Sequence, residues 1–408
     1  MKKLASLMLT LSMLAALLAG CGGTAADNSG AGSETNEGAA ANESTAANDT
    51  ADTATGGEVF KIGGIGPVTG DAAAYGIAVR NGAQLAVDEI NAAGGINGVQ
   101  IAFGFEDDEH DAEKAVNAYN ALKDWDMQLL MGTVTSTPCL AVAEETKNDN
   151  LFMLTPSGTA VDCVQYDNAF RVCFSDPNQG GKSAEYIGTN KIASKVAVIY
   201  NSSDVYSSGI YEEFAKKAPE YGIEIVEAAA FTKDSSTDFT IQLQKAKDGG
   251  AELIFLPIYY QEAALILSQA NSMGYSPMFF GCDGLDGILA VEDFDVALAE
   301  GVMLLTPLVA DENETTKAFV NNYEAAYGET PIQFAANAYD AIYIIKAALE
   351  QAGATPDMDA SELCELLKTA MTEITVSGLT GEMTWTADGE VNKEPKAVKI
   401  ADGAYTAM

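Results

Sequence analysis

Residues 155–159, TPSGT, follow the apolar run LFML at 151–154 and carry three hydroxyl groups together with several backbone amides. Hydroxyls and free N–H groups at the carboxyl end of a parallel strand are the groups with which open α/β folds hold anionic ligands. The same small residues also form ordinary turns, because Gly and Pro suit turn dihedrals. Taken by itself, the stretch allows either an anion site or a turn without a ligand.

Two other glycine-rich stretches do not match nucleotide-binding motifs. NQGGKSA at 178–184 ends like a phosphate-binding loop, but Asp176 stands where the first Gly is required. GGIGPVTG at 63–70 lacks the third correctly spaced Gly of a dinucleotide fingerprint. We therefore expect no nucleotide cofactor, and no other cofactor is indicated.

His110, the only histidine, lies among acids in DDEHDAE at 107–113. Acids that precede a helix are favoured by the helix dipole, so we expect a helix start here and no metal site. A serine hydrolase triad has little support with one His and no GxSxG elbow. A hydrolase working through Ser136 and Asp283 would lack a base of near-neutral pKa. We therefore predict that the protein is not an enzyme.

Charge excludes one class of partner. The 408 residues include 22 basic and 59 acidic side chains, a net charge of −37, so nucleic acid would be repelled at long range. Beyond Cys21 there are five cysteines, an odd number that leaves at least one thiol free. Cys163 and Cys173 are the best candidates for a disulfide, and the sequence leaves that pairing open.

The first residues predict export. Two lysines precede an uncharged apolar stretch at 4–18, which is too short to span a bilayer comfortably, and the stretch ends in LAGC. We expect a signal peptide over 1–20. LAGC resembles the lipobox of bacterial lipoproteins, which implies that Cys21 carries a diacylglyceryl group and anchors the chain to the cell membrane. A plain cleavable signal followed by a chance Cys is the alternative.

Residues 22–57 consist of Ala, Gly, Asn, Ser, Thr and acids, without an aromatic or basic side chain. Such a composition cannot bury enough apolar surface to offset its chain entropy. We interpret 21–57 as the lipidated Cys and a disordered tether. The remainder is long enough for two domains.

The remainder alternates short apolar runs with longer amphipathic segments. Predicted strands cover 59–65, 100–105, 128–131, 151–154, 195–200, 224–229, 253–256 and 278–280. Predicted helices include 76–93, 112–123, 141–148, 209–221, 239–247 and 261–273. Strands that are apolar throughout indicate parallel sheets covered on both faces. The α/β pattern is too long for one sheet, so we predict two doubly wound parallel-sheet lobes with a crevice at their carboxyl-end loops.

The chain from residue 60 resembles the type I periplasmic binding proteins, and most closely the leucine/isoleucine/valine-binding proteins of branched-chain amino acid ABC transporters. The matching runs are KIGGIGPVTGDAAAYGIAVRNGAQLAVDEINAAGGING (61–98), MGTVTSTPCLAVAEETKNDNLFMLTPSGT (131–159), FRVCFSDPNQG (170–180), VAVIYNSSDVYSSG (196–209) and YYQEAALILSQANSMGYSPMFFGCDG (259–284). The resemblance implies lobes joined by hinge crossovers, with lobe 1 formed by 58–177 with 307–383 and lobe 2 by 178–306 with 384–408.

The resemblance also implies a binding site for an amino acid. Ser136, Ser157 and Thr159 would meet the ligand carboxylate, and Asp283 would meet its ammonium group. The aromatic positions that line or close the pocket would be Tyr75, Tyr206 and Tyr259. Purely structural roles remain open: the tyrosines could be core residues, Asp283 could cap a helix or shape a turn, and Ser136 could be an N-cap.

One departure from the family concerns a disulfide that some members carry near the site. Its two positions correspond here to His110 and Thr135, so the resemblance implies that this disulfide is missing. The resulting hypothesis is a monomeric, lipid-anchored, extracytoplasmic substrate-binding subunit that delivers an amino acid, best a branched-chain aliphatic one, to ABC permease subunits. Binders of amides, urea or aromatic acids on the same fold, and ligand sensors, are the alternatives.

Overall fold

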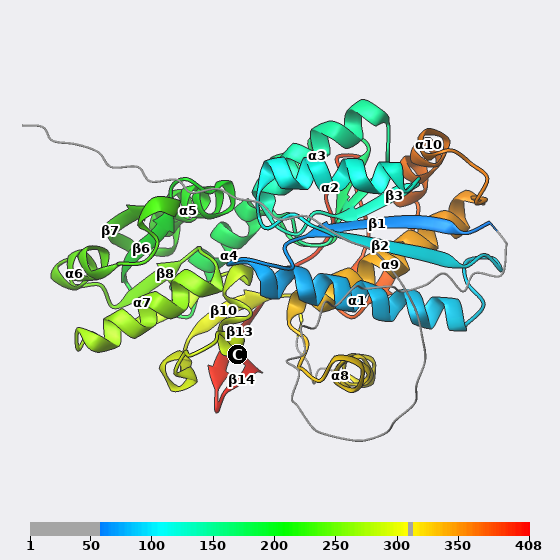
Figure 1. Ribbon diagram of the computed structural model, residues 1–408. Helices are drawn as coiled ribbons and strands as arrows, with labels where there is room; N and C mark the ends of the chain where they lie inside the picture. Colours follow the sequence, from blue (N-terminus) through cyan, green and yellow to red (C-terminus); the bar gives the residue numbers. More distant parts are fainter. Residues whose placement is uncertain (1–57, 309–312) are drawn as a thin grey trace, which may run out of the picture. The chain divides into compact units, whose positions relative to one another are not determined.

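Short apolar strands and amphipathic helices build two sheets that share one strand order (Figure 1). The computed structural model describes residues 58–308 and 313–408; the predicted signal, Cys21 and the tether lie outside the described residues. The first sheet is parallel throughout, with the order β2-β1-β3-β4-β5. Its strands are β1 Phe60–Gly66, β2 Ile101–Asp107, β3 Leu129–Gly132, β4 Met153–Thr155 and β5 Ala169–Arg171.

The second sheet repeats this order as β7-β6-β8-β9-β10 and then adds β13 and β14, which are antiparallel. Its strands are β6 Lys195–Asn201, β7 Glu224–Phe231, β8 Leu253–Leu256, β9 Met278–Gly281, β10 Met303–Thr306, β13 Lys396–Ala401 and β14 Ala404–Ala407. A separate antiparallel pair consists of β11 Val376–Gly378 and β12 Gly381–Met383. The prediction of two parallel α/β sheets is therefore confirmed in outline, and the second sheet is mixed at one edge.

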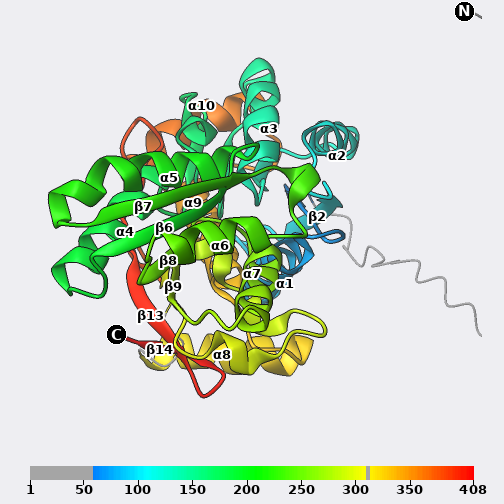
Figure 2. The ribbon, with the colours of Figure 1, turned by 90° about the vertical axis from the view of Figure 1, so that its left-hand side faces the viewer.

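Helices cover both faces of each sheet. In the first lobe α1 and α9 pack on one face and α2 and α3 on the other; in the second, α4 and α5 lie opposite α6 and α7 (Figures 1 and 2). Their bounds are α1 Ala73–Ala92, α2 Ala112–Asp124, α3 Ser136–Asp149, α4 Asp176–Thr189, α5 Val205–Lys217, α6 Thr240–Asp248, α7 Tyr260–Ser272, α8 Glu314–Tyr327, α9 Gln333–Ala352 and α10 Ala360–Met371.

Strand β6 shows why the sheets are buried on both sides. Val196 and Val198 pack against α4 and α5, whereas Ala197 and Ile199 pack toward α6 and α7. Because successive strand side chains point to opposite faces, a strand that is apolar at every position needs helices on both sides. The all-apolar runs in the sequence therefore predicted the layers correctly.

Other predictions were incomplete. The sequence-based strands omitted β5 and β10 to β14, and the helix starts differ by up to several residues; the helix predicted from residue 141, for example, begins at Ser136. The pairing left open for Cys163 and Cys173 is not formed, since both are buried free thiols, as are Cys139, Cys282 and Cys364. Among the described residues, no helix is long and apolar enough to cross a membrane.

The topology fixes where a ligand can bind. In both sheets the strand order reverses direction at β1 and at β6, and open α/β sheets bind ligands outside the carboxyl ends of their strands at such switch points. The loops after β3, β4, β8 and β9, together with the starts of α1 and α5, reach this region. These loops contain every site residue predicted from the sequence.

Candidate functional site

The seven predicted site residues line one small cavity. The side chains of its walls fill most of the space, which leaves a cavity of about 10 Å³. The first lobe contributes Tyr75, Ser136, Ser157, Thr159 and also Val134, Thr135 and Phe334; the second contributes Tyr206, Tyr259, Asp283 and Gly284. Residues as far apart in the chain as Tyr75 and Phe334 thus form one surface.

One end of the cavity is the amino end of α3. Thr135 occupies the N-cap position in an extended conformation, but its side chain does not cap the helix. Its hydroxyl lies 2.9 Å from Nδ1 of His110 instead. The first amides of α3, beginning at Ser136, therefore lack the partner that an N-cap side chain would supply, and such helix starts attract anions.

The TPSGT turn completes this end. Thr155 donates its hydroxyl to the Thr133 carbonyl at 2.6 Å and accepts the Gly158 amide at 2.8 Å, so it shapes the turn. A Cβ on Gly158 would lie 2.7 Å from Sγ of Cys139 and 2.8 Å from the Thr155 hydroxyl oxygen, so a larger residue there would displace these side chains. Ser157 donates its hydroxyl to the Val134 carbonyl at 2.7 Å.

The backbone amide and the hydroxyl of Thr159 form the rest of this end of the cavity. Within the described part of the chain, its amide has no hydrogen-bond acceptor. Its hydroxyl lies 3.4 Å from the hydroxyl of Ser136, which in turn accepts the Ala160 amide at 3.2 Å. Ser136 and Thr159 both line the cavity, so their hydroxyls and the unbonded Thr159 amide give this end the kind of donors that bind a carboxylate.

The opposite end is a buried carboxylate. Asp283 is 5% exposed and begins the short helix η4, Asp283–Leu285. Its Oδ1 accepts the Tyr206 hydroxyl at 2.8 Å, and its backbone amide donates to Gln179 at 3.0 Å. Burial raises the pKa of the Asp283 carboxyl to about 6, against the lowering effect of the Tyr206 bond. No Lys or Arg lines the cavity, so the charged carboxylate has no cationic partner in its walls.

Aromatic rings form the sides. Tyr206 and Tyr259 stack at 4.8 Å with planes 10° apart, and Tyr75 stacks on Phe334 at 4.3 Å. Tyr75 also joins the lobes, because its hydroxyl donates to the Gly284 carbonyl at 2.5 Å and accepts the Tyr260 amide at 3.2 Å. The cavity therefore presents an anion-binding end, an acidic end and apolar sides.

Several residues at this site were not predicted as site residues: Val134, Thr135, Phe334 and Gly284 in the walls of the cavity, and Gln333 and Asp176 beside it. Phe334 lies on α9, and only the return of the chain to the first lobe brings it to the cavity. Gln333 donates its side chain to the Asp283 carbonyl at 3.1 Å. Asp176, which the sequence offered only as a mismatch to a phosphate loop, is buried beside Thr159; burial raises the pKa of its carboxyl well above the ordinary value, and the Thr159 hydroxyl opposes this. In the sequence, the run SDPNQG at 175–180, which belongs to a stretch that carries the family resemblance, was the only feature that pointed to Asp176.

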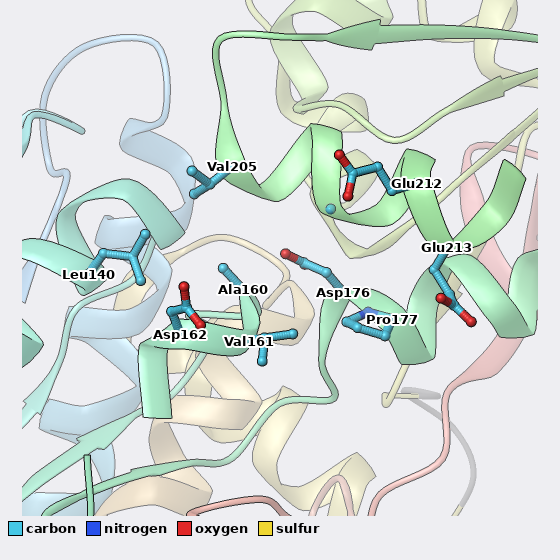
Figure 3. A pocket seen from close by; sticks show the side chains of 10 residues that line it. Leu140, Ala160, Val161, Asp162, Asp176, Pro177, Val205, Glu212 and Glu213 are labelled. Atoms are coloured by element: carbon cyan, nitrogen blue, oxygen red, sulfur yellow. The ribbon is translucent and has the colours of Figure 1, made fainter. Parts of the chain in front are cut away.

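A larger hollow of about 280 Å³ lies next to the site (Figure 3). The two spaces are lined by neighbouring residues of the chain: Ala160 in the hollow follows Thr159 in the cavity, and Val205 in the hollow precedes Tyr206 in the cavity. Its polar groups are four carboxylates, those of Asp162, Asp176, Glu212 and Glu213. Because this hollow offers charges of one sign only, we place the site at the smaller cavity, where donors and an acceptor face each other. The described residues include no cluster able to hold a metal ion.

His110 is part of the frame of the site. Its ring bonds Thr135 on one side and meets the ring of Tyr259 edge-on at 5.4 Å. Burial lowers the pKa of His110 to about 4, so the ring is neutral at pH 7. The two positions at which the family resemblance implied a missing disulfide are thus joined by a hydrogen bond.

Comparison with known proteins decides the family. A profile described as "Periplasmic binding protein" matches residues 59–404. The chain belongs to the periplasmic binding protein family. This binding protein is 31% identical over 304 residues to Leu/Ile/Val-binding protein homolog 3 of Brucella melitensis, covering 73% of this chain and 81% of that protein. It is 28% identical to the leucine-, isoleucine-, valine-, threonine- and alanine-binding protein of Pseudomonas aeruginosa, covering 76% and 82%.

Solved structures agree. The branched-chain amino acid transporter substrate binding protein LivJ of Streptococcus pneumoniae, in complex with isoleucine, superposes with a TM-score of 0.78 at 30% identity, over 86% of this chain and 98% of that one. A solute binding protein of R. palustris in complex with benzoate gives 0.75 at 20% identity, over 86% and 95%, which shows the shared fold. The type I fold and the resemblance to Leu/Ile/Val-binding proteins are therefore confirmed for this binding protein.

Proposed function

We propose that this protein is the extracytoplasmic substrate-binding subunit of an ABC importer and that it binds a small L-amino acid, best a branched-chain aliphatic one. The observation that carries the proposal is the pairing of a donor-rich end at Ser136 and Thr159 with the buried carboxylate of Asp283. A zwitterion satisfies both ends at once. The names of the relatives support the same class of ligand.

In this proposal each site residue has a role. Ser136, Ser157 and Thr159 hold the carboxylate through hydroxyls and backbone groups, and Asp283 holds the ammonium group. Tyr75, Tyr206 and Tyr259 enclose the aliphatic side chain. Charge-assisted hydrogen bonds contribute roughly 1.5–3 kcal/mol each, so the two ends supply most of the selectivity for amino acids.

The two lobes, 58–177 with 307–383 and 178–306 with 384–408, close over the ligand as units. Tyr75 supports this view because its hydroxyl in lobe 1 bonds the backbone of lobe 2 at Gly284. The closed monomer would then be the form that ABC permease subunits receive.

A thermal-shift screen tests the ligand class. Aliphatic L-amino acids should raise the melting temperature by several degrees at 100 times their Kd, since binding to the folded state alone adds about 2.7 kcal/mol. Aspartate and glutamate should not, because a second carboxylate would meet aromatic walls and Asp283. Benzoate fits the aromatic walls but leaves Asp283 without a cation. A shift with benzoate, urea or an amide alone would contradict the proposal.

We further propose that Cys21 is lipidated and that 22–57 tether the binding domain to the membrane. The support is the LAGC sequence after the apolar stretch. Cys21→Ser should release the protein into the medium or leave its signal uncleaved. Fractionation of cells expressing each form checks this, and a Cys21→Ser protein that stays in the membrane with its signal removed would exclude Cys21 as the anchor.

A further inference from the structure

We propose that Arg171 is a positioning residue that holds the TPSGT turn in its carboxylate-binding shape and thereby sets the preference for ligands with a free carboxylate. The inference rests on the proposed function. Arg171 ends β5, is fully buried, and does not line the cavity. It acts through the backbone of the turn rather than by touching the ligand.

The guanidinium of Arg171 donates hydrogen bonds to four consecutive backbone carbonyls. Nη1 donates to the Gly158 carbonyl at 3.3 Å and to the Thr159 carbonyl at 2.6 Å. Nη2 donates to the carbonyls of Ala160 and Val161 at 2.9 and 3.0 Å. The planar fork of a guanidinium presents several N–H groups in fixed directions, so it orients four peptide groups together.

The orientation of these carbonyls determines where the amides point. In a trans peptide the C=O of one residue and the N–H of the next point in opposite directions. With the carbonyls of Gly158 and Thr159 directed at Arg171, the amides of Thr159 and Ala160 point away from it. The Ala160 amide meets the hydroxyl of Ser136, and the Thr159 amide has no protein acceptor among the described residues. Arg171 thus turns donors toward the anion-binding end.

Arg171 is itself fixed by a segment distant in sequence. Its amide donates to the Gly389 carbonyl at 3.1 Å, and its carbonyl accepts the indole N–H of Trp385 at 2.8 Å. Nε lies 3.4 Å from the Glu390 carboxylate. Gly389 has φ of 77°, and a Cβ there would lie 2.2 Å from the Ala169 carbonyl oxygen. The backbone of Arg171 is therefore held by several contacts, so the loss of one backbone contact leaves the guanidinium in place beside the turn.

Calorimetric titration of Arg171→Lys with L-leucine and with L-leucinamide tests the role. Lysine keeps the charge but cannot address four carbonyls in a plane. We expect the Kd for leucine to rise about 10- to 100-fold and that for leucinamide, which lacks the carboxylate, by less than threefold. The ratio of the two affinities should fall at least threefold. Equal losses for both ligands, or an unchanged ratio, would overturn the proposal.

Trp385→Phe is the matched control, because it removes a buried hydrogen bond to the backbone of the same Arg171 without touching the guanidinium. It should lower the melting temperature and leave the ratio within twofold of wild type. If Arg171→Lys does not fold, Glu390→Gln replaces it, because the Glu390 side chain is 40% exposed and contacts Nε of Arg171. Loss of this ion pair should lower the ratio of the two affinities about twofold to threefold. An unchanged ratio would contradict the role of Arg171. If the wild-type protein does not bind leucine, the proposed function is wrong. If the wild-type protein binds leucine and Arg171→Lys keeps the wild-type ratio of the leucine and leucinamide affinities, only this inference is wrong.

Discussion

Asp283→Asn should weaken the binding of aliphatic amino acids by two to three orders of magnitude. The ligand ammonium would be desolvated in the closed cavity without its counter-charge, which costs roughly 3–5 kcal/mol. Asparagine keeps an oxygen that can accept the Tyr206 hydroxyl, so the aromatic wall should stay in place. Calorimetric titration with the amino acid found in the thermal screen measures the loss.

The unliganded protein should respond in the opposite direction. Because burial raises the pKa of Asp283 from 3.8 to about 6, its charged form disfavours the folded state at pH 7, by an amount on the order of 1–3 kcal/mol. Asp283→Asn removes this charge, so the melting temperature without ligand should stay the same or rise. An affinity within fivefold of wild type would remove Asp283 from the site.

Asp286→Asn is the matched control. Asp286 lies three residues further in the same turn, is 4% exposed, and burial likewise raises the pKa of its carboxyl to about 6. Its Oδ2 accepts the Gln333 amide at the start of α9, and it does not line the cavity. Its replacement should change the affinity less than threefold, so a loss as large as that of Asp283→Asn would point to a structural effect.

Lowering the pH should weaken ligand binding and stabilise the unliganded protein, and both effects should arise from protonation of Asp283. A carboxyl whose folded pKa is raised binds its proton more tightly in the folded state, so its contribution to stability improves as the pH falls from about 7 toward 4. The same proton competes with the ligand ammonium. Between pH 7 and pH 5 the affinity for an aliphatic amino acid should fall about tenfold, since roughly nine-tenths of Asp283 is then protonated.

Titrations at pH 5, 6 and 7 on wild type and Asp283→Asn check this dependence. Asp204 shares the behaviour, because burial raises its pKa to about 6 against the lowering effect of the hydrogen bond from the Thr137 hydroxyl. Burial also raises the pKa of Glu262 to about 7. The mutant should therefore keep a shallow slope and lose the main part of the tenfold change. Equal slopes in both proteins would show that other carboxyls govern the pH response.

The sequence alone was sufficient for the strands whose pattern is local. The strand predicted at 253–256 coincides with β8, Leu253–Leu256. The strand predicted at 195–200 matches β6, Lys195–Asn201, except for its last residue. An apolar run bounded by polar turns contains its own signal, because burial on both faces demands apolar side chains at every position. The edge strand β14, Ala404–Ala407, carries no such signal, since it is largely exposed and pairs only on one side.

Through family resemblance, the sequence also predicted seven site residues, and the structure brings them to the walls of one cavity. Their hydrogen bonds did not. Ser157 and Thr159 look equivalent as hydroxyls in TPSGT, yet the Ser157 hydroxyl bonds the Val134 carbonyl, while Thr159 faces the cavity. The partner of each hydroxyl, Val134 for Ser157 and Ser136 for Thr159, lies 23 residues away in the chain, and no local pattern records it.

Only the tertiary structure decided how the donor-rich end of the site is prepared. Thr135 leaves α3 uncapped because His110, from the loop after β2, takes its hydroxyl. Arg171 becomes the buried support of the turn because the chain returns at Gly389 to fix it. Sequence specifies which groups can donate or accept, but burial and long-range pairing determine which of them remain unsatisfied, and the unsatisfied groups are the ones that can bind a ligand.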